Sequence, residues 1–150
     1  MHKKAIFLVE DNPDDEELTL RALKKNNIAN EVIVARDGAE ALDYMFGEGK
    51  YAGRNVHDLP ALILLDLKLP KVSGLEVLQR LRADPRTVMV PVVILTSSRE
   101  ERDLVAGYRR GTNSYIHKPV DFDQFTEAVR QLSRYWLLLN ELPSGNKDVT

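Results

Sequence analysis

Short apolar runs alternate with stretches of helical periodicity along most of this 150-residue chain. Five runs have the length and composition of buried strands, and they span residues 5–9, 31–35, 61–65, 90–95 and 113–116. Because most of these runs are apolar rather than alternating, we expect both faces of the strands to be covered, as in a parallel sheet. Five β–α units joined by right-handed crossovers predict an α/β fold, a doubly wound, flavodoxin-like sheet with strand order 2-1-3-4-5.

Capping residues and helical spacing set the expected limits of the helices. Asn12 has the position of an N-cap, and Pro13 then occupies the first helical position. Gly47 is placed to end the second helix in a left-handed conformation. A weakly amphipathic helix is expected over residues 99–110, and a long final helix over 121–140.

The composition narrows the classes of function. The chain has 21 basic and 23 acidic residues, a net charge of −2 and no cysteine. This balance argues against nucleic acid or an anionic membrane surface as the main partner, and the lack of cysteine excludes disulfides and thiolate metal sites. No stretch approaches the ~20 apolar residues of a membrane span. We therefore expect a cytoplasmic protein.

Polar residues follow four of the five predicted strands. Glu10 and Asp11 follow the first strand, Asp66 the third, Thr96 the fourth and Lys118 the fifth. The carboxyl ends of parallel strands meet at one edge of the sheet, so these side chains are expected to gather there. Clustered carboxylates repel unless a cation compensates, and hard oxygen ligands suit Mg²⁺. A lysine and a hydroxyl opposite the metal suit phosphoryl oxygens, and an aspartate can itself accept a phosphoryl group.

Four motifs at these strand ends together resemble the receiver domain of two-component response regulators. They are Leu8-Val9-Glu10-Asp11-Asn12, Leu64-Leu65-Asp66-Leu67-Lys68-Leu69-Pro70, Leu95-Thr96-Ser97-Ser98 and Tyr115-Ile116-His117-Lys118-Pro119. The resemblance covers roughly residues 3–135. Each motif alone is weak, but their order and their positions at the strand ends are specific to this family.

The resemblance implies a phosphoacceptor and a metal site. Asp66 resembles the aspartate that accepts a phosphoryl group from a histidine of a sensor kinase. Glu10 and Asp11 resemble the acidic pair that holds Mg²⁺, together with Asp66 and the backbone carbonyl of Lys68.

The resemblance also implies a switch that responds to phosphorylation. Thr96 resembles the hydroxyl that turns toward the phosphoryl group, and Tyr115 the aromatic side chain that follows it inward. Lys118 resembles the lysine that pairs with the phosphoryl oxygens, and the Lys118–Pro119 bond is expected to be cis. The surface formed by the fourth helix, the fifth strand and the fifth helix is then expected to change.

Two segments narrow the resemblance further. The link over residues 47–60 is long, and residues 135–143 extend the last helix. Both features are similar to stand-alone regulators that partner bacterial phytochrome histidine kinases. We expect a receiver domain over 1–142, a flexible tail over 143–150 and no output domain, so that signals leave through protein contacts.

The apolar face of the final helix extends beyond the expected edge of the sheet. This pattern favours a homodimer formed through the helix and its extension, with folding back onto the domain as the alternative. The candidate contacts are Phe125, Leu132, Trp136 and Leu139.

Two other functions remain open from the sequence. A small aspartate-dependent phosphatase or phosphotransferase would commonly have an acid two residues after its nucleophile, where this chain has Lys68. A constitutive pseudo-receiver adaptor is the other alternative, although the site looks complete. The acids at 14–17 are assigned to the dipole of the first helical turn, and His57 and His117 to no site. We expect a signalling protein rather than an enzyme.

Overall fold

The computed structural model describes residues 4–97 and 113–128, and it contains the predicted parallel sheet. The strands are β1 (Ile6–Val9), β2 (Val32–Ala35), β3 (Leu62–Asp66), β4 (Val92–Thr96) and β5 (Asn113–His117). Their order is β2-β1-β3-β4-β5, with every neighbouring pair parallel. The doubly wound, flavodoxin-like fold is therefore confirmed.

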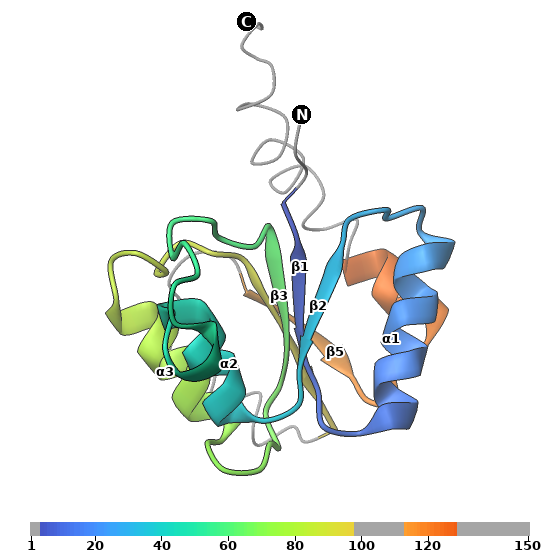
Figure 1. The fold of residues 1–150 in the computed structure, drawn as a ribbon. Coiled ribbons are helices and arrows are strands. Elements are labelled where there is room, and N and C mark those ends of the chain that lie inside the picture. Colours follow the sequence, from blue (N-terminus) through green and yellow to red (C-terminus); the bar gives the residue numbers. More distant parts are fainter. Residues whose placement is uncertain (1–3, 98–112, 129–150) are drawn as a thin grey trace, which may run out of the picture.

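Helices cover both faces of this sheet (Figure 1). The described helices are α1 (Pro13–Lys25), α2 (Gly38–Phe46), α3 (Gly74–Ala83), a 3-10 turn η1 (Gly49–Tyr51) and residues 122–128. Alternate residues of the strands point into two separate cores, one with α2 and α3 and the other with α1 and the 122–128 helix. β1, β3 and β4 are buried along their whole length, which explains why their sequences are apolar without alternation.

The two capping signals in the sequence are confirmed. The Asn12 side chain accepts hydrogen bonds from the backbone N–H groups of Asp14 and Asp15, at 2.8 and 3.0 Å. Gly47 ends α2 with φ of 66°, a conformation in which a side chain would be strained. The cap on α1 matters for function because it fixes the helix directly after the Glu10-Asp11 pair.

The 47–60 link is more ordered than its sequence indicated. It contains η1 and folds back along α2, where the Tyr51 hydroxyl donates to Glu40 Oε2 at 3.0 Å. The Tyr51 and Tyr44 rings meet edge to face at 5.1 Å, and the Arg54 guanidinium lies 3.9 Å from the centre of the Tyr44 ring. No hydrophobic period marks this segment because polar and aromatic contacts order it.

Some expectations fall on residues outside the described ranges, namely the 99–110 helix, the end of the final helix and the 143–150 tail. Leu132, Trp136 and Leu139 are among these residues. Phe125 is described, and as a dimer contact it was wrong: it is 1% exposed and packs in the core beside α1. Within residues 4–97 and 113–128, no helix is long and apolar enough to span a membrane.

Candidate functional site

The strand ends bring the predicted acidic residues together. One carboxylate oxygen from each of Glu10, Asp11 and Asp66 lies within 4.8 Å of the others. Glu10 directly follows β1 and is fully buried, Asp66 ends β3 at 3% exposure, and Asp11 lies at the surface. Three carboxylate oxygens at this spacing, one of them open to solvent, form a donor set that suits a hard divalent cation.

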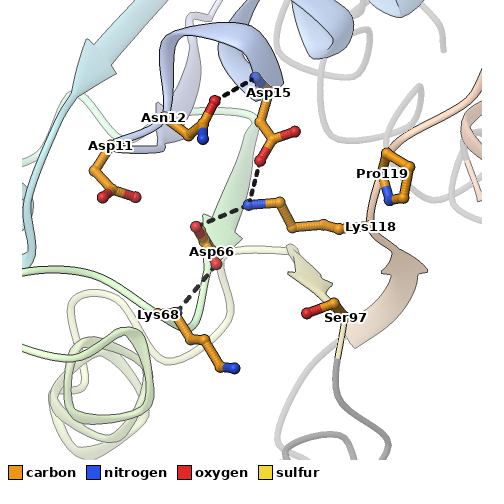
Figure 2. A pocket seen from close by; sticks show the side chains of 8 residues that line it. All are labelled: Asp11, Asn12, Asp15, Asp66, Lys68, Ser97, Lys118 and Pro119. Atoms are coloured by element: carbon orange, nitrogen blue, oxygen red, sulfur yellow. Dashed lines mark hydrogen bonds and ion pairs between the residues drawn. The ribbon is translucent and has the colours of Figure 1, made fainter.

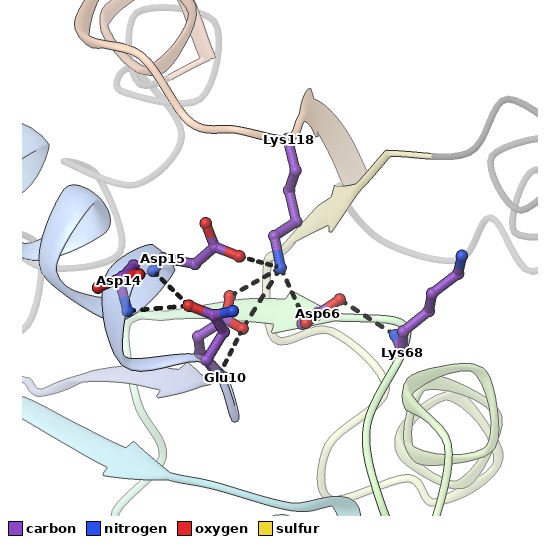
Figure 3. A network of polar contacts seen from close by, with 7 residues as sticks. Glu10, Asp14, Asp15, Asp66, Lys68 and Lys118 are labelled. Atoms are coloured by element: carbon purple, nitrogen blue, oxygen red, sulfur yellow. Dashed lines mark hydrogen bonds and ion pairs between the residues drawn. The ribbon is translucent and has the colours of Figure 1, made fainter.

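Lys118 reaches this cluster from the end of β5 (Figure 3). Its Nζ lies 3.0 Å from Asp66 Oδ2, 3.2 Å from Glu10 Oε1 and 2.8 Å from Asp15 Oδ2. Lys118–Pro119 is a cis peptide bond, as expected, and the Lys118 backbone N–H donates to the Thr96 carbonyl at 2.9 Å. The ammonium group therefore contacts three carboxylates, one directly after β1, one in the first turn of α1 and one at the end of β3.

Burial and crowding alter the acidity of these groups. Burial raises the pKa of Glu10 to about 7, and the neighbouring Asp66 carboxylate adds to this effect. Burial alone would lower the pKa of Lys118, but its hydrogen bonds to Asp15 and Asp66 outweigh burial and raise it. Lys118 is therefore a fixed positive charge, whereas Glu10 changes charge near neutral pH.

The backbone around Asp66 is tightly constrained. The Lys68 backbone N–H donates to Asp66 Oδ1 at 3.0 Å, which fixes one carboxylate oxygen and leaves Oδ2 facing Lys118. A Cβ atom on Gly74 would lie 2.1 Å from the Asp66 carbonyl oxygen, so only glycine lets α3 begin this close to β3.

The predicted switch residues lie on the two neighbouring strands. Thr96 ends β4 and is 1% exposed, and Tyr115 lies on β5, half-buried against the core formed with α2 and α3. Ile94 pairs with Tyr115, and Thr96 pairs with His117. Both residues therefore have the placement that a relay from the site along β4 and β5 needs.

A hollow of about 380 Å³ opens above these groups (Figure 2). Its lining residues are Asp11, Asn12, Asp15, Asp66, Lys68, Ser97, Lys118 and Pro119. A phosphoryl group at Asp66 would therefore meet the Lys118 ammonium and the Ser97 hydroxyl. The Glu10 and Asp11 carboxylates lie close enough to hold a cation beside it. Asp11, Asp66, Lys68 and Lys118 therefore line the hollow as predicted. Glu10 belongs to the carboxylate group next to it, but neither Glu10 nor Thr96 is among the lining residues.

Asp15 is the residue of this site that the sequence did not reveal. Its charge was assigned to the helix dipole, yet its side chain forms the shortest of the three ion pairs of Lys118. The available signal was its position, because a residue in the first turn of a helix that begins at a strand end can face the same edge as Asp11. His57 and His117, which were assigned to no site, do not line the hollow.

A family model described as the response regulator receiver domain matches residues 6–130. The chain belongs to this family. Response regulator Rcp1 from Synechocystis sp. (strain ATCC 27184 / PCC 6803 / Kazusa) is 37% identical over 142 residues, which are 95% of each chain. Proteins that consist of a receiver domain alone are generally signalling proteins rather than enzymes.

Solved structures give the same result. The bacteriophytochrome response regulator RtBRR has a TM-score of 0.80 and 55% identity, and the match covers 88% of this chain and 78% of that one. The phosphorylated cyanobacterial phytochrome response regulator RcpA has a TM-score of 0.72 and 42% identity, covering 91% and 95%. The Mn²⁺-bound form of Rcp1 has a TM-score of 0.71 and 37% identity, covering 89% and 94%. The receiver domain of this chain is thus similar to metal-bound and phosphorylated relatives.

Proposed function

We propose that this receiver domain is a phosphorylation switch in which Asp66 accepts a phosphoryl group from a sensor histidine kinase. The observation that carries the proposal is the setting of Asp66, whose Oδ2 lies 3.0 Å from the Lys118 ammonium within a group of three carboxylates. A buried carboxylate with an ammonium on one side and a cation site on the other can accept an anionic group.

The transfer needs no further reactant. Asp66 Oδ2 forms a bond to phosphorus while the phosphorus–nitrogen bond of the donor phosphohistidine breaks, and the nitrogen keeps the electron pair. Glu10, Asp11, Asp66 and the Lys68 carbonyl would hold Mg²⁺, which would neutralise charge on the phosphoryl oxygens. The Lys118 ammonium neutralises the same charge from the other side.

The second part of the proposal is the response of the surface. The added charge at Asp66 draws in the Thr96 hydroxyl and the Lys118 ammonium, and Tyr115 then turns toward the space that Thr96 leaves. The equilibrium between two arrangements of the surface at β5 and its neighbouring helices shifts as a result. Output then passes through protein contacts rather than through nucleic acid.

The decisive experiment is incubation with acetyl phosphate and Mg²⁺, followed by intact-protein mass spectrometry. We expect a gain of one phosphoryl group in the wild type and none in Asp66→Asn or when Mg²⁺ is chelated. Asp58→Asn is the matched control, because Asp58 is an exposed aspartate of the 47–60 link and should not alter the gain. Uptake by Asp66→Asn, or none by the wild type even with its kinase, would contradict the proposal.

The kinase that we propose is of the bacterial phytochrome type. The support is the similarity to phytochrome response regulators, namely RtBRR at 55% identity and RcpA at 42%. Radiolabelled phosphate should pass faster from an autophosphorylated phytochrome kinase than from an unrelated histidine kinase. Equal rates from both kinases would remove this part of the proposal and leave the role of Asp66 in place.

We also propose a homodimer formed by the extension of the final helix, on the strength of the apolar pattern at Leu132, Trp136 and Leu139. Phe125 is excluded as a direct contact because it is buried within the domain. Light scattering should give twice the monomer mass for the wild type and the monomer mass for Trp136→Ala. An unchanged mass in that variant would contradict the dimer.

A further inference from the structure

The Lys118 ammonium group contacts three carboxylates, which is one more than metal binding and phosphoryl transfer account for. An ammonium group has three N–H donors, and here Asp15, Asp66 and Glu10 receive them, at 2.8, 3.0 and 3.2 Å. Asp66 and Glu10 belong to the group of three carboxylates that can hold a cation, whereas Asp15 does not. The contact between Asp15 and Lys118 therefore needs an explanation other than metal binding.

Asp15 is held in place to make this contact. Its backbone N–H donates to the Asn12 side chain at 3.0 Å within the first turn of α1, and its carboxylate then faces the hollow that Asp66 and Lys118 also line (Figure 2). Its side chain is 20% exposed and that of Lys118 is 14% exposed, so solvent screens the pair only in part.

From this geometry we propose that Asp15 is a positioning residue that competes with the phosphoryl group for the Lys118 ammonium. This inference rests on the proposed function, because it assumes that Asp66 is the acceptor. In the resting protein Asp15 holds one N–H group of Lys118. In the phosphorylated protein the phosphoryl oxygens need that N–H group, and the Asp15 carboxylate repels them across the same hollow. Asp15 therefore shortens the lifetime of the phosphorylated state.

Asp15→Asn tests this competition, since it removes the charge and keeps the shape. Wild type and variant are phosphorylated with acetyl phosphate and Mg²⁺, the donor is removed, and loss of the phosphoryl group is followed by intact-protein mass spectrometry. We expect the loss to slow by about three- to tenfold, the scale of one charge contact in a partly buried site. Asp15→Glu, which keeps the carboxylate, should retain a rate near that of the wild type.

Asp14→Asn is the matched control. Asp14 carries the same charge in the same turn of α1 and also donates its N–H to Asn12, but it is exposed and lies on the side of Asp15 away from Lys118 (Figure 3). A role in the helix dipole alone would make the two asparagine variants alike. Equal rates in the two variants, or faster loss in Asp15→Asn, would overturn the inference while the proposed function stands. Absence of phosphorylation in every protein, the wild type included, would instead overturn the proposed function and with it the inference.

Discussion

The two ends of the sheet differ in the balance of their acidic and basic groups. At the carboxyl ends of the strands, four carboxylates (Glu10, Asp11, Asp15 and Asp66) outnumber the ammonium groups of Lys118 and Lys68, and Lys118 contacts three of them. At the amino ends, residues 47–61 lead into β3 and residues 84–91 lead into β4. The arginine side chains in these two loops pair with acceptor groups of the same loops. We call these two segments the entry loops.

The contacts of the entry loops show this matching in detail. Arg82 Nη1 donates to the Val88 and Val90 carbonyls, both at 3.0 Å. Arg86 pairs with Asp84 through two of its nitrogens, at 3.1 and 2.8 Å, and Arg54 donates to the Asn55 carbonyl at 2.7 Å. Matched charges fix the shape of a loop, whereas an excess of one charge leaves a site that gains from binding a cation. The comparison therefore predicts different responses to substitution at the two ends.

The largest effect is expected from Arg82→Met at the amino ends. The substitution keeps most of the aliphatic stem but removes the donor to the buried Val90 carbonyl and the partly buried Val88 carbonyl, so we expect a loss of about 3 kcal/mol in the free energy of unfolding. Urea unfolding followed by circular dichroism measures this loss. Arg80→Met is the control because Arg80 is exposed on the same helix and should cost less than about 1 kcal/mol.

Phosphorylation by acetyl phosphate should survive in Arg82→Met at temperatures where the variant is folded, since Arg82 is not among the residues that line the site. A variant as stable as the wild type would show that the Arg82 contacts do not hold the entry loop. A folded variant that cannot be phosphorylated would show that the two ends of the sheet are not independent.

The next effect is a dependence of stability on pH and Mg²⁺ at the carboxyl ends. The pKa of Glu10 is raised to about 7, so the folded state binds a proton more tightly than the unfolded state does. Without metal, stability should therefore fall as the pH rises, by about 1.4 kcal/mol between about pH 6 and about pH 8. Mg²⁺ must displace that proton, so its affinity should be about tenfold weaker at the lower pH. Thermal unfolding with and without Mg²⁺ measures both effects.

Glu10→Gln provides the control for this prediction, because it removes the titrating group and keeps its size. The variant without metal should show neither the fall in stability over this pH range nor the stronger stabilisation by Mg²⁺ at the higher pH. A wild type that became more stable as the pH rose without metal would contradict the prediction. It would show that the charged form of Glu10 does not destabilise this end of the sheet.

The same contrast explains what the sequence could predict. β1, β3 and β4 are buried on both faces, so their apolar runs identified the strands, and the strand ends then placed Glu10, Asp11, Asp66, Thr96 and Lys118 together. The sequence did not identify Asp15 as a site residue, because an acid in a first helical turn interacts favourably with the helix dipole in any case. Its partner, Lys118, lies 103 positions away in the sequence. Such a long-range pairing depends on how α1 lies on the sheet, which local patterns do not contain.

The order of the 47–60 link could not be predicted from the sequence for a related reason. Its order depends on single contacts to side chains already fixed in α2, such as Tyr51 to Glu40, and no repeat in the sequence records them. Phe125 shows the opposite error, because helical spacing continued from the domain core into the extension and did not mark where burial ends. Periodicity therefore predicts which face of a helix is apolar, but not which part of that face a partner could reach.

The smallest effect on stability is expected at the 47–60 link. It measures how much the polar contacts of the link contribute to the free energy of unfolding. Tyr51→Phe removes the hydroxyl that donates to Glu40 Oε2 and keeps the ring against Tyr44, so we expect a loss of about 1 kcal/mol in the free energy of unfolding. Lys50→Met is the matched control because Lys50 pairs with the same Glu40 oxygen at 3.2 Å but is 68% exposed. An exposed ion pair contributes about 0–1 kcal/mol, so the control should lose less than Tyr51→Phe does. Equal losses in the two variants would mean that charge alone, rather than a half-buried hydrogen bond, holds the link on α2.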